Sequence, residues 1–377
     1  MPGSPQRFIG LMSGTSMDGM DAVIADFSAA SITLIAHAHL PYPAKLLDLL
    51  QQLSIPGDNE IDQLGAAEYG VAELSVAVIA KCLSKAGLTA RDIIAIGSHG
   101  QTIRHRPRNA QQEVMSPFTL QVGDPNVIAV QTGIPVVADF RRKDMALGGQ
   151  GAPLVPAFHQ ATFDTPKRTE AILNLGGIAN ITLLPEHSSQ QSVIGFDTGP
   201  ANTLMDVWIK QQKGLAYDHD GEWSRSGNVI QDLLSRMLQD PYFQLPAPKS
   251  TGKEYFSTQW LNHYLGNSSL RAEDIQATLC ALTVTSISQA LKPYPPINEL
   301  IVCGGGALNR YLLEQLSQHL PQTTVVTSHS RGIDPMHVEA LAFAWLAKQF
   351  YARLPGNIPA VTGASRPAIL GALYPAE

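Results

Sequence analysis

The sequence predicts an α/β protein built from two related domains, and three observations support this. Short β-rich runs alternate with longer segments whose apolar residues recur at helical spacing, which is typical of α/β folds. A strand–turn–strand unit with glycine at its tip opens each half of the chain, and such recurrence indicates duplication. The length of 377 residues is sufficient for two domains, each with its own core.

In the first half, the apolar run 8–12 and the run 21–26 predict the two strands of a hairpin with a polar tip. Residues 60–86 carry apolar residues at helical spacing and predict a long helix. Residues 93–96 predict a buried strand, which we expect to end in a glycine-flanked turn over 97–102.

In the second half, residues 171–184 predict the second strand–turn–strand unit. Residues 299–303 predict a strand that runs into a triple glycine, with a helix after it. The last long helix is expected over about 337–351. Residues 244–254, which contain paired prolines and lysines, are expected to form a mobile surface loop.

The segment 164–168 is a suitable boundary between the two domains. We predict a first domain over residues 1–166, completed by the C-terminal helix and tail over 352–377. The second domain is predicted over residues 167–351.

The composition excludes several classes of protein. The chain has 26 basic and 32 acidic residues, a net charge of −6, whereas nucleic-acid binding usually needs a basic face. Its three cysteines form no CxxC pair, which argues against a disulfide framework or a zinc site. The sequence shows neither a signal peptide at its start nor an apolar run long enough to cross a membrane. We therefore expect a cytoplasmic protein without a nucleic-acid or membrane partner.

The loop between the first two predicted strands resembles a P-loop without being one. Gly14 and Gly19 have the separation of that motif, but Met20 and Asp21 stand where it needs lysine and a hydroxyl residue. A carboxylate cannot neutralise phosphate as an ammonium does, so a P-loop is excluded. Two glycines and several hydroxyls in one tip still favour phosphate binding through backbone N–H groups. The acids in this loop are suited to a Mg²⁺ ion bound through water. The alternative to a phosphate-binding loop is a plain hairpin turn.

Two further glycine clusters follow predicted strands. Gly176 and Gly177 lie between two strands, where a tight bend is the alternative interpretation. The triple glycine 304–306 lies between a strand and a helix, so a ligand could lie against its backbone at the helix N-terminus. Its pattern is not GxGxxG, which disfavours a dinucleotide-binding Rossmann site.

Asp197, within the segment 195–200, is the main candidate for a catalytic group. Aspartic proteases share its Asp-Thr-Gly sequence but need two such aspartates, and the chain contains no second copy. We expect Asp197 to follow a strand on a glycine turn, where it is placed to act as a general base. A turn-forming aspartate that bonds its own backbone is the alternative.

Three other residues are candidates for binding a substrate, each with a structural alternative. His99 is expected in a turn after a buried strand, although a lone histidine is usually structural. Arg142 belongs to a charged cluster over 139–144 that precedes a glycine-rich segment over 148–153. A charged cluster followed by such a segment favours binding of an anionic group of the substrate, and a solvated edge of the fold is the alternative. Glu339 begins the final helix, where an acid also serves the helix dipole.

Taken together, these segments resemble the anhydro-N-acetylmuramic acid kinase family. The resemblance extends to residue 375 and so covers nearly the whole chain. It is carried by residues 10–21, 97–102, 139–142, 148–153, 174–180, 196–200 and 303–306. This family belongs to the superfamily of actin, sugar kinases and heat-shock ATPases. The resemblance therefore implies two related actin-like (ribonuclease H-like) α/β domains with an ATP cleft between them.

The resemblance also implies the reaction and its residues. The implied substrates are ATP and 1,6-anhydro-N-acetylmuramic acid. Mg²⁺ is expected to accompany ATP, bridged to the protein by water and not held directly by a side chain. Asp197 would take a proton from the water that opens the anhydro bridge, and the released O6 would be phosphorylated. Substrate contacts are expected from His99, Arg142 and Glu339, and the family suggests a homodimer. The residues expected to contact ATP are Gly14, Thr15, Ser16, Met17, Asp18, Gly19, Met20, Asp21, Gly176, Gly177, Asn180, Gly304, Gly305 and Gly306.

Two alternatives share this fold. A nucleotide and sugar sensor without catalysis would be favoured by a helix-turn-helix extension, and none is visible before Phe8. A plain hydrolase would open the anhydro sugar, or split ATP, without transferring phosphate.

Overall fold

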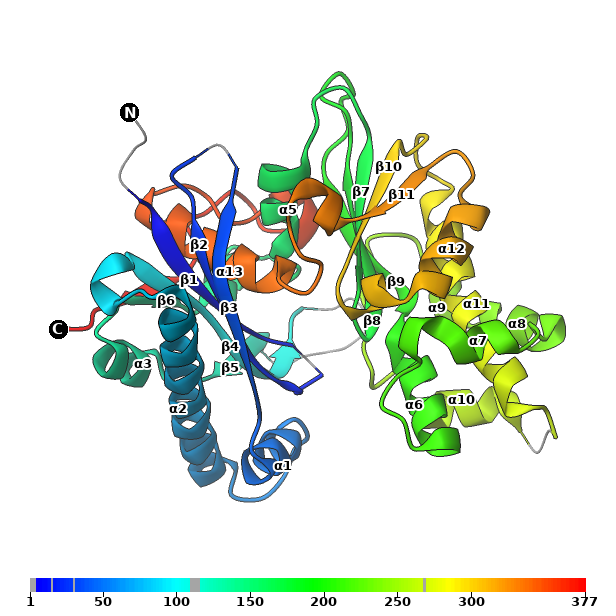
Figure 1. The fold of residues 1–377 in the computed structure, drawn as a ribbon, viewed down its shortest axis with the longest axis horizontal. Helices are drawn as coiled ribbons and strands as arrows, with labels where there is room; N and C mark the ends of the chain where they lie inside the picture. Colours follow the sequence, from blue (N-terminus) through cyan, green and yellow to red (C-terminus); the bar gives the residue numbers. More distant parts are fainter. Residues whose placement is uncertain (1–4, 15, 30, 109–115, 267–268) are drawn as a thin grey trace. The chain divides into compact units, whose positions relative to one another are not determined.

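The computed structural model describes residues 5–14, 16–29, 31–108, 116–266 and 269–377, and it divides the chain into two compact units (Figure 1). Unit 1 comprises Met1–Thr162 and His337–Glu377, and unit 2 comprises Phe163–Met336. Each unit has its own sheet and its own apolar core. The predicted α/β class is confirmed.

The described residues of unit 1 form a seven-stranded sheet with the order β12-β6-β4-β1-β2-β3, and β5 pairs with β4. Strands β1, β2 and β3 are antiparallel neighbours, whereas β4 runs parallel to β1, and β6 parallel to β4. The strands are β1 (Arg7–Ser13), β2 (Gly19–Asp26), β3 (Thr33–Pro41), β4 (Ala95–Arg106), β5 (Phe118–Val122), β6 (Val136–Ala138) and β12 (Ala372–Tyr374).

The five-stranded sheet of unit 2 repeats this arrangement, with the order β11-β10-β7-β8-β9. Three consecutive antiparallel strands, β7 to β9, are again followed by two parallel strands, β10 and β11. This shared order confirms the predicted duplication and the related ribonuclease H-like domains. The strands are β7 (Glu170–Leu175), β8 (Ile178–Leu184), β9 (Ile194–Pro200), β10 (Glu299–Cys303) and β11 (Thr324–Thr327).

Several predicted elements are confirmed by the structure. Both hairpins are present, as β1–β2 and β7–β8, the long helix is α2 (Glu60–Ala86), and β10 leads into the triple glycine. The predicted turn over 97–102 is wrong, because these residues lie inside β4. That strand is paired with β1 on one side and with β5 and β6 on the other. Hydrogen bonding on both sides keeps the chain extended there, and the positive φ of +72° at Gly100 gives only a local irregularity.

The last long helix, α13 (Val338–Tyr351), belongs to unit 1, which corrects the predicted second domain over 167–351. Gly10 on β1 and Gly97 on β4 are paired neighbours. A β-carbon built on Gly10 would lie 1.9 Å from the carbonyl oxygen of Ala340, and one on Gly97 would lie 2.0 Å from that of Phe343. The backbone of α13 thus rests directly on the sheet because these two positions lack side chains.

Replacing Gly10 with alanine should therefore destabilise unit 1. The new methyl group would overlap the backbone of α13, and such overpacking typically costs about 1–3 kcal/mol. Urea denaturation should show a lower midpoint than the wild type. Gly65→Ala in α2 is a matched control, because its β-carbon would meet nothing within 4 Å. Replacing a helical glycine with alanine usually gains up to about 1 kcal/mol, so a loss of stability there, or none for Gly10→Ala, would contradict this packing.

Helices cover both faces of the unit 1 sheet. On β1, Ile9 and Leu11 point into the core that also contains Val71 and Val78 of α2, whereas Gly10 between them faces α13. This follows from the alternation of side chains along a strand, and Figure 1 shows α2 beside this sheet. The helices of unit 1 are α1 (Ala44–Leu53), α2, α3 (Pro125–Thr132), α4 (Phe140–Ala146), α5 (Val155–Phe163), whose last residue falls in unit 2, α13 and α14 (Pro359–Thr362).

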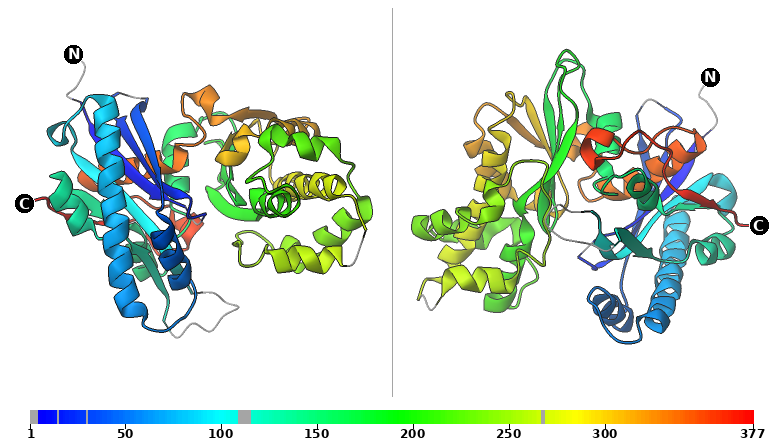
Figure 2. Two further views of the ribbon diagram at one scale, coloured as in Figure 1. Left: turned by 60° about the horizontal axis from the view of Figure 1, so that its bottom comes forward. Right: turned by 180° about the vertical axis from the view of Figure 1, so that it is seen from behind.

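In unit 2, a layer of helices packs on one face of the sheet and forms the core with it. The long helix α11 (Ala272–Leu291), coloured yellow in Figure 2, contacts α6, α7, α8 and α12. The other helices of unit 2 are α6 (Asn202–Lys213), α7 (Glu222–Ser226), α8 (Gln231–Leu238), α9 (Pro241–Gln244), α10 (Thr258–Leu265) and α12 (Arg310–His319).

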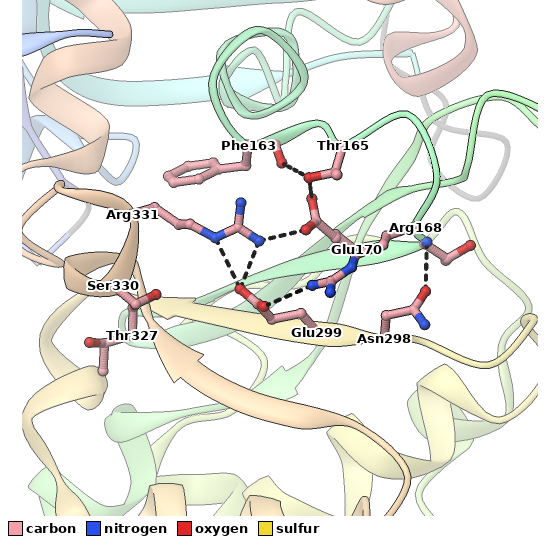
Figure 3. A network of polar contacts seen from close by, with 10 residues as sticks. Phe163, Thr165, Arg168, Glu170, Asn298, Glu299, Thr327, Ser330 and Arg331 are labelled. Carbon is pink, nitrogen blue, oxygen red and sulfur yellow. Dashed lines mark hydrogen bonds and ion pairs between the residues drawn. The ribbon is translucent and has the colours of Figure 1, made fainter.

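An ion pair with a buried carboxylate joins the first strand of unit 2 to the segment after β11 (Figure 3). Glu170, at the start of β7, is fully buried and accepts hydrogen bonds from Arg331 (2.6 Å) and from the Thr165 hydroxyl (2.9 Å). Arg331 also donates to Glu299 on β10 (2.9 Å). A single guanidinium therefore joins the starts of two neighbouring parallel strands.

Candidate functional site

The glycine loop of unit 1 connects β1 to β2. Thr15 lies outside the described residues, and Gly19, Met20 and Asp21, predicted as part of the loop, are the first residues of β2. Gly19 can begin β2 beside β3 because it has no side chain. A β-carbon there would lie 2.3 Å from the carbonyl oxygen of Leu40 on β3. Met20 is fully buried, so its side chain serves the core and only its backbone can face a ligand. The loop proper is short and spans 14–18.

A buried polar cluster holds both ends of this loop. The Ser13 hydroxyl donates to the Gln101 side chain (2.6 Å), lies 2.7 Å from the Gly19 carbonyl oxygen, and accepts a hydrogen bond from the Tyr42 hydroxyl (3.0 Å). Gln101 in turn donates to the carbonyl oxygen of Gly14 (3.2 Å). Buried polar groups that satisfy one another restrict a loop to one conformation. We did not select Gln101 or Tyr42 from the sequence, although Gln101 lies in the quoted segment 97–102.

The acids of unit 1 lie close enough to influence one another. Burial raises the pKa of Asp21. The His39 ring, whose Nδ1 lies 3.0 Å from Asp21 Oδ1, opposes this rise, and the nearby Asp18 carboxylate adds to it. Burial also raises the pKa of Glu339, in the first turn of α13, and there Asp21 and Asp18 add to the rise while Arg141 opposes it. Three carboxylates thus share one region of unit 1, where a cation would stabilise their charged forms.

His99 and Arg141 are joined within unit 1. His99 is buried in β4, and its Nε2 accepts hydrogen bonds from the Arg141 guanidinium at 2.8 and 3.2 Å. Burial, with Arg141 adding to it, lowers the pKa of His99 well below its usual range, so the imidazole is neutral. Arg141 also donates to the carbonyl oxygen of Gly151 (2.9 Å) in the predicted anion-binding segment. Arg142, chosen from the sequence, is largely exposed and lies 3.5 Å from Asp139.

In unit 2, the Gly176–Gly177 turn joins β7 to β8 and is held by the start of α6. The Asn202 side chain donates to the carbonyl oxygens of Leu175 (3.0 Å) and Gly176 (2.8 Å). The Gly177 carbonyl oxygen accepts from the backbone N–H groups of Ala201 and Thr203 and from the Thr203 hydroxyl. These bonds fix the turn at the carboxyl end of β7, the edge where ligands bind in α/β sheets.

The triple glycine lies at the neighbouring strand end, after β10. Gly304 has a φ of +79°, and a β-carbon there would lie 2.3 Å from the Asn174 side-chain oxygen. A β-carbon on Gly306 would lie 2.6 Å from that of Leu175. Around Gly305, in contrast, there is nothing within 4 Å of such an atom. Packing against the end of β7 therefore requires two of the glycines, and the third leaves open space beside the backbone.

Asp197 lies inside β9, which corrects the predicted position on a turn after a strand. Its register partner on β8 is Asn180, and the partner of Asn180 on β7 is Asn174. These three polar residues form a row across the sheet, on the face opposite the side chains of the core residues Leu173 and Ile181. The structure thus brings together Asn180 and Asp197, two of the residues predicted from the sequence.

The carboxylate of Asp197 is held by a segment that follows α9. The Thr251 backbone N–H donates to its Oδ2 (3.0 Å), and the Asp197 N–H donates to the Lys249 carbonyl oxygen (2.9 Å). The Tyr242 hydroxyl donates to the Asp197 carbonyl oxygen (2.7 Å). Burial raises the pKa of Asp197 to about 6, with Thr251 opposing the rise and Glu254 adding to it. A carboxyl with that pKa is well placed to act as a base near neutral pH.

Comparison with known proteins identifies the family. A family model described as anhydro-N-acetylmuramic acid kinase matches residues 6–376. The curated enzyme of that name from Shewanella sp. strain MR-4 is 52% identical over 371 residues, covering 98% of this chain and 99% of its own. That of Shewanella denitrificans is 52% identical over 374 residues, covering 99% of both chains. The chain belongs to the anhydro-N-acetylmuramic acid kinase family.

Membership of the anhydro-N-acetylmuramic acid kinase family makes this chain a phosphotransferase that acts on a sugar with ATP. Among solved structures, the activator of 2-hydroxyisocaproyl-CoA dehydratase from Clostridium difficile with bound ADPNP matches with a TM-score of 0.46. It is 13% identical, covering 90% of this chain and 93% of that one.

No described helix is long and apolar enough to cross a membrane. Within the same residues, no three His, Cys, Asp or Glu side chains are placed to bind a metal ion together.

Proposed function

We propose that this chain uses ATP to open the 1,6-anhydro bond of 1,6-anhydro-N-acetylmuramic acid and to phosphorylate O6. The product would be N-acetylmuramic acid 6-phosphate, formed during recycling of the cell wall. The observation that carries the proposal is Asp197, a partly buried carboxylate with a raised pKa that is held in place by a backbone N–H group. Family membership supplies the sugar.

In the proposed reaction, Asp197 accepts a proton from a water molecule as the water oxygen attacks the anomeric carbon. The bond between that carbon and O6 breaks, and its electron pair stays on O6. The oxygen then attacks the terminal phosphorus of ATP, and ADP leaves. Attack on the face opposite the leaving oxygen follows the logic of inverting glycoside hydrolysis, in which one carboxylate activates the water.

We assign phosphate binding to backbone groups in each unit. In unit 1 the loop 14–18, with the first residues of β2, supplies N–H groups, and in unit 2 the turn Gly176–Gly177 does so. The open side of Gly305 is proposed to lie against adenosine. For the sugar, His99, Arg142 and Glu339 remain the proposed contacts. We add Arg141, because its guanidinium bonds His99 and interacts electrostatically with Glu339.

Mg²⁺ is proposed to accompany ATP. Asp18 and Asp21 would hold this ion through water molecules, since Mg²⁺ usually keeps several waters and no three described His, Cys, Asp or Glu side chains are placed to bind it together. When bound, it would neutralise charge on the phosphates.

The proposal also includes a cytoplasmic location. In the described part of the chain, Cys82, Cys280 and Cys303 are buried thiols not joined by disulfides, which suits a reducing compartment.

Incubation of the purified protein with ATP, Mg²⁺ and the anhydro sugar tests the function. Mass spectrometry should detect a sugar 6-phosphate and ADP in equal amounts. An opened sugar without phosphate, or ADP without a sugar phosphate, would identify a hydrolase. Binding of both ligands without any turnover would identify a sensor.

The pKa of Asp197 predicts how the rate depends on pH. The base must be ionised, so kcat/KM should fall about tenfold per pH unit below about pH 6. Because the pKa of Asp197 is higher in the folded state than in the unfolded chain, protonation of Asp197 favours the folded state. The contribution of Asp197 to the free energy of unfolding therefore increases as the pH falls through about 6. Steady-state rates from pH 5 to 8, with melting temperatures at each pH, test this. A flat profile down to pH 5 would contradict the assignment of Asp197 as the base.

A further inference from the structure

The segment 249–254, which we call the strap, lies beside Asp197 on β9, an edge strand of the unit 2 sheet. Two hydrogen bonds join it to Asp197, one from the Thr251 N–H to the carboxylate and one from the Asp197 N–H to the Lys249 carbonyl oxygen. The Lys249 ammonium is itself tied to the carbonyl oxygen of Tyr242 (3.0 Å). The strap is thus anchored at its start and bonded directly to the proposed base.

Further along the strap, the side chain of Lys253 lies against the Gly176–Gly177 turn. A β-carbon built on Gly177 would lie 2.8 Å from Lys253 Cε and 3.7 Å from its Nζ, and 2.7 Å from the Thr203 hydroxyl oxygen. The ammonium group therefore sits over the bare face of the glycine to which phosphate binding is assigned. Any larger residue at position 177 would displace it.

Asp206, on α6, interacts electrostatically with the same ammonium group. Burial raises the pKa of Asp206 to about 7, and attraction to Lys253 is the main influence that opposes the rise. Lys253 is partly buried, so its ammonium group lies close to the Gly177 turn and within electrostatic reach of this carboxyl. A phosphate at the turn would meet a cation that is already positioned.

The chain length between the two anchored residues limits how far apart they can be. Thr251 and Lys253 are two residues apart, and two residues span at most about 7 Å. The backbone that bonds the base and the backbone that carries the ammonium are therefore adjacent. Since Asp197 acts on the sugar, the phosphate closest to this segment is the one transferred to that sugar, which is the terminal phosphate of ATP.

We propose that Lys253 contacts the terminal phosphate of ATP at the Gly176–Gly177 turn, and that the strap links this phosphate to Asp197. The inference rests on the proposed function, which assigns Asp197 as the base. An ammonium at this place neutralises charge on the phosphoryl group during its transfer. One short segment would then position both the base that starts the reaction and the phosphate that is transferred to O6.

Nucleotide binding without sugar tests the role of Lys253. By isothermal titration calorimetry, Lys253→Met should weaken the binding of Mg²⁺-ATP at least about tenfold, while Mg²⁺-ADP binding changes less than about threefold. Lys253→Arg should recover most of the ATP affinity, because it keeps the charge. Lys210→Met, which removes an exposed lysine from the same helix as Asp206, is the control and should bind both nucleotides like the wild type.

The ratio of ATP to ADP affinity decides this inference. A Lys253→Met variant that binds both nucleotides like the wild type, or loses both equally, would overturn it, as would a wild-type protein that binds no ATP. Absence of sugar phosphate with wild-type protein would instead contradict the proposed function. A selective loss of ATP affinity in Lys253→Met would in that case still support the phosphate contact.

Discussion

Replacing Asp197 with asparagine should lower kcat at least about a hundredfold, since a general base contributes roughly a hundredfold or more. An amide cannot accept the proton from water, whereas its oxygen can still accept the hydrogen bond from the Thr251 N–H group. The variant should therefore fold and bind ATP like the wild type. Sugar 6-phosphate formed per enzyme in a fixed time, measured by mass spectrometry, gives the rate.

The stability of this variant distinguishes a catalytic role from a structural one. Because burial raises the pKa of Asp197, ionisation at pH 7 opposes folding, and removing the charge should leave the melting temperature equal or higher. A variant that melts early and loses activity in proportion would indicate a structural aspartate. Retention of more than about a tenth of the wild-type kcat would refute the assignment of Asp197 as the base.

Replacing Arg331 with methionine should strongly destabilise unit 2. It would leave the fully buried Glu170 carboxylate without its cationic partner, with the Thr165 hydroxyl still donating to it (Figure 3). Breaking a buried ion pair from one side typically costs about 3–5 kcal/mol. The midpoint of urea denaturation, followed by tryptophan fluorescence, measures the effect.

Arg310→Met serves as the matched control, because it removes the same side chain from an exposed pair with Asp220 at 3.6 Å. Exposed pairs contribute about 0–1 kcal/mol, so its denaturation midpoint should stay close to that of the wild type. Equal effects of the two substitutions would show that burial of Glu170 does not determine the energy of its pair.

The sequence predicted those parts of the site that depend on neighbours along the chain. The two hairpins with glycine tips, the helix α2 and the strand that leads into the triple glycine all follow from local periodicity. The position of Asp197 was predicted less well. Its glycine neighbours suggested a turn, but pairing with β8 keeps the segment extended as β9. Strand pairing depends on residues far away in the sequence, and it overrides the local preference for a turn.

Arg141 and Arg142 illustrate the same limit. Adjacent arginines are equivalent in a sequence pattern, but on α4 they point in different directions, so one bonds the buried His99 and the other is exposed. Nor did the sequence suggest Tyr242 or Thr251, which the structure places beside Asp197. A segment expected to be a mobile surface loop holds the proposed base through its backbone, and a backbone contact leaves no signature in residue type.

By itself, the sequence determined the α/β class, the duplication, the family and the loops assigned to phosphate, because each is written in a contiguous motif or a regular spacing. The tertiary structure alone decided that α13 belongs to unit 1, where Gly10 and Gly97 admit its backbone to the sheet. It also decided the raised pKa of Asp197 and the place of Lys253 at the Gly177 turn. Burial and contact between distant segments depend on the path of the folded chain, and local spacing does not encode that path.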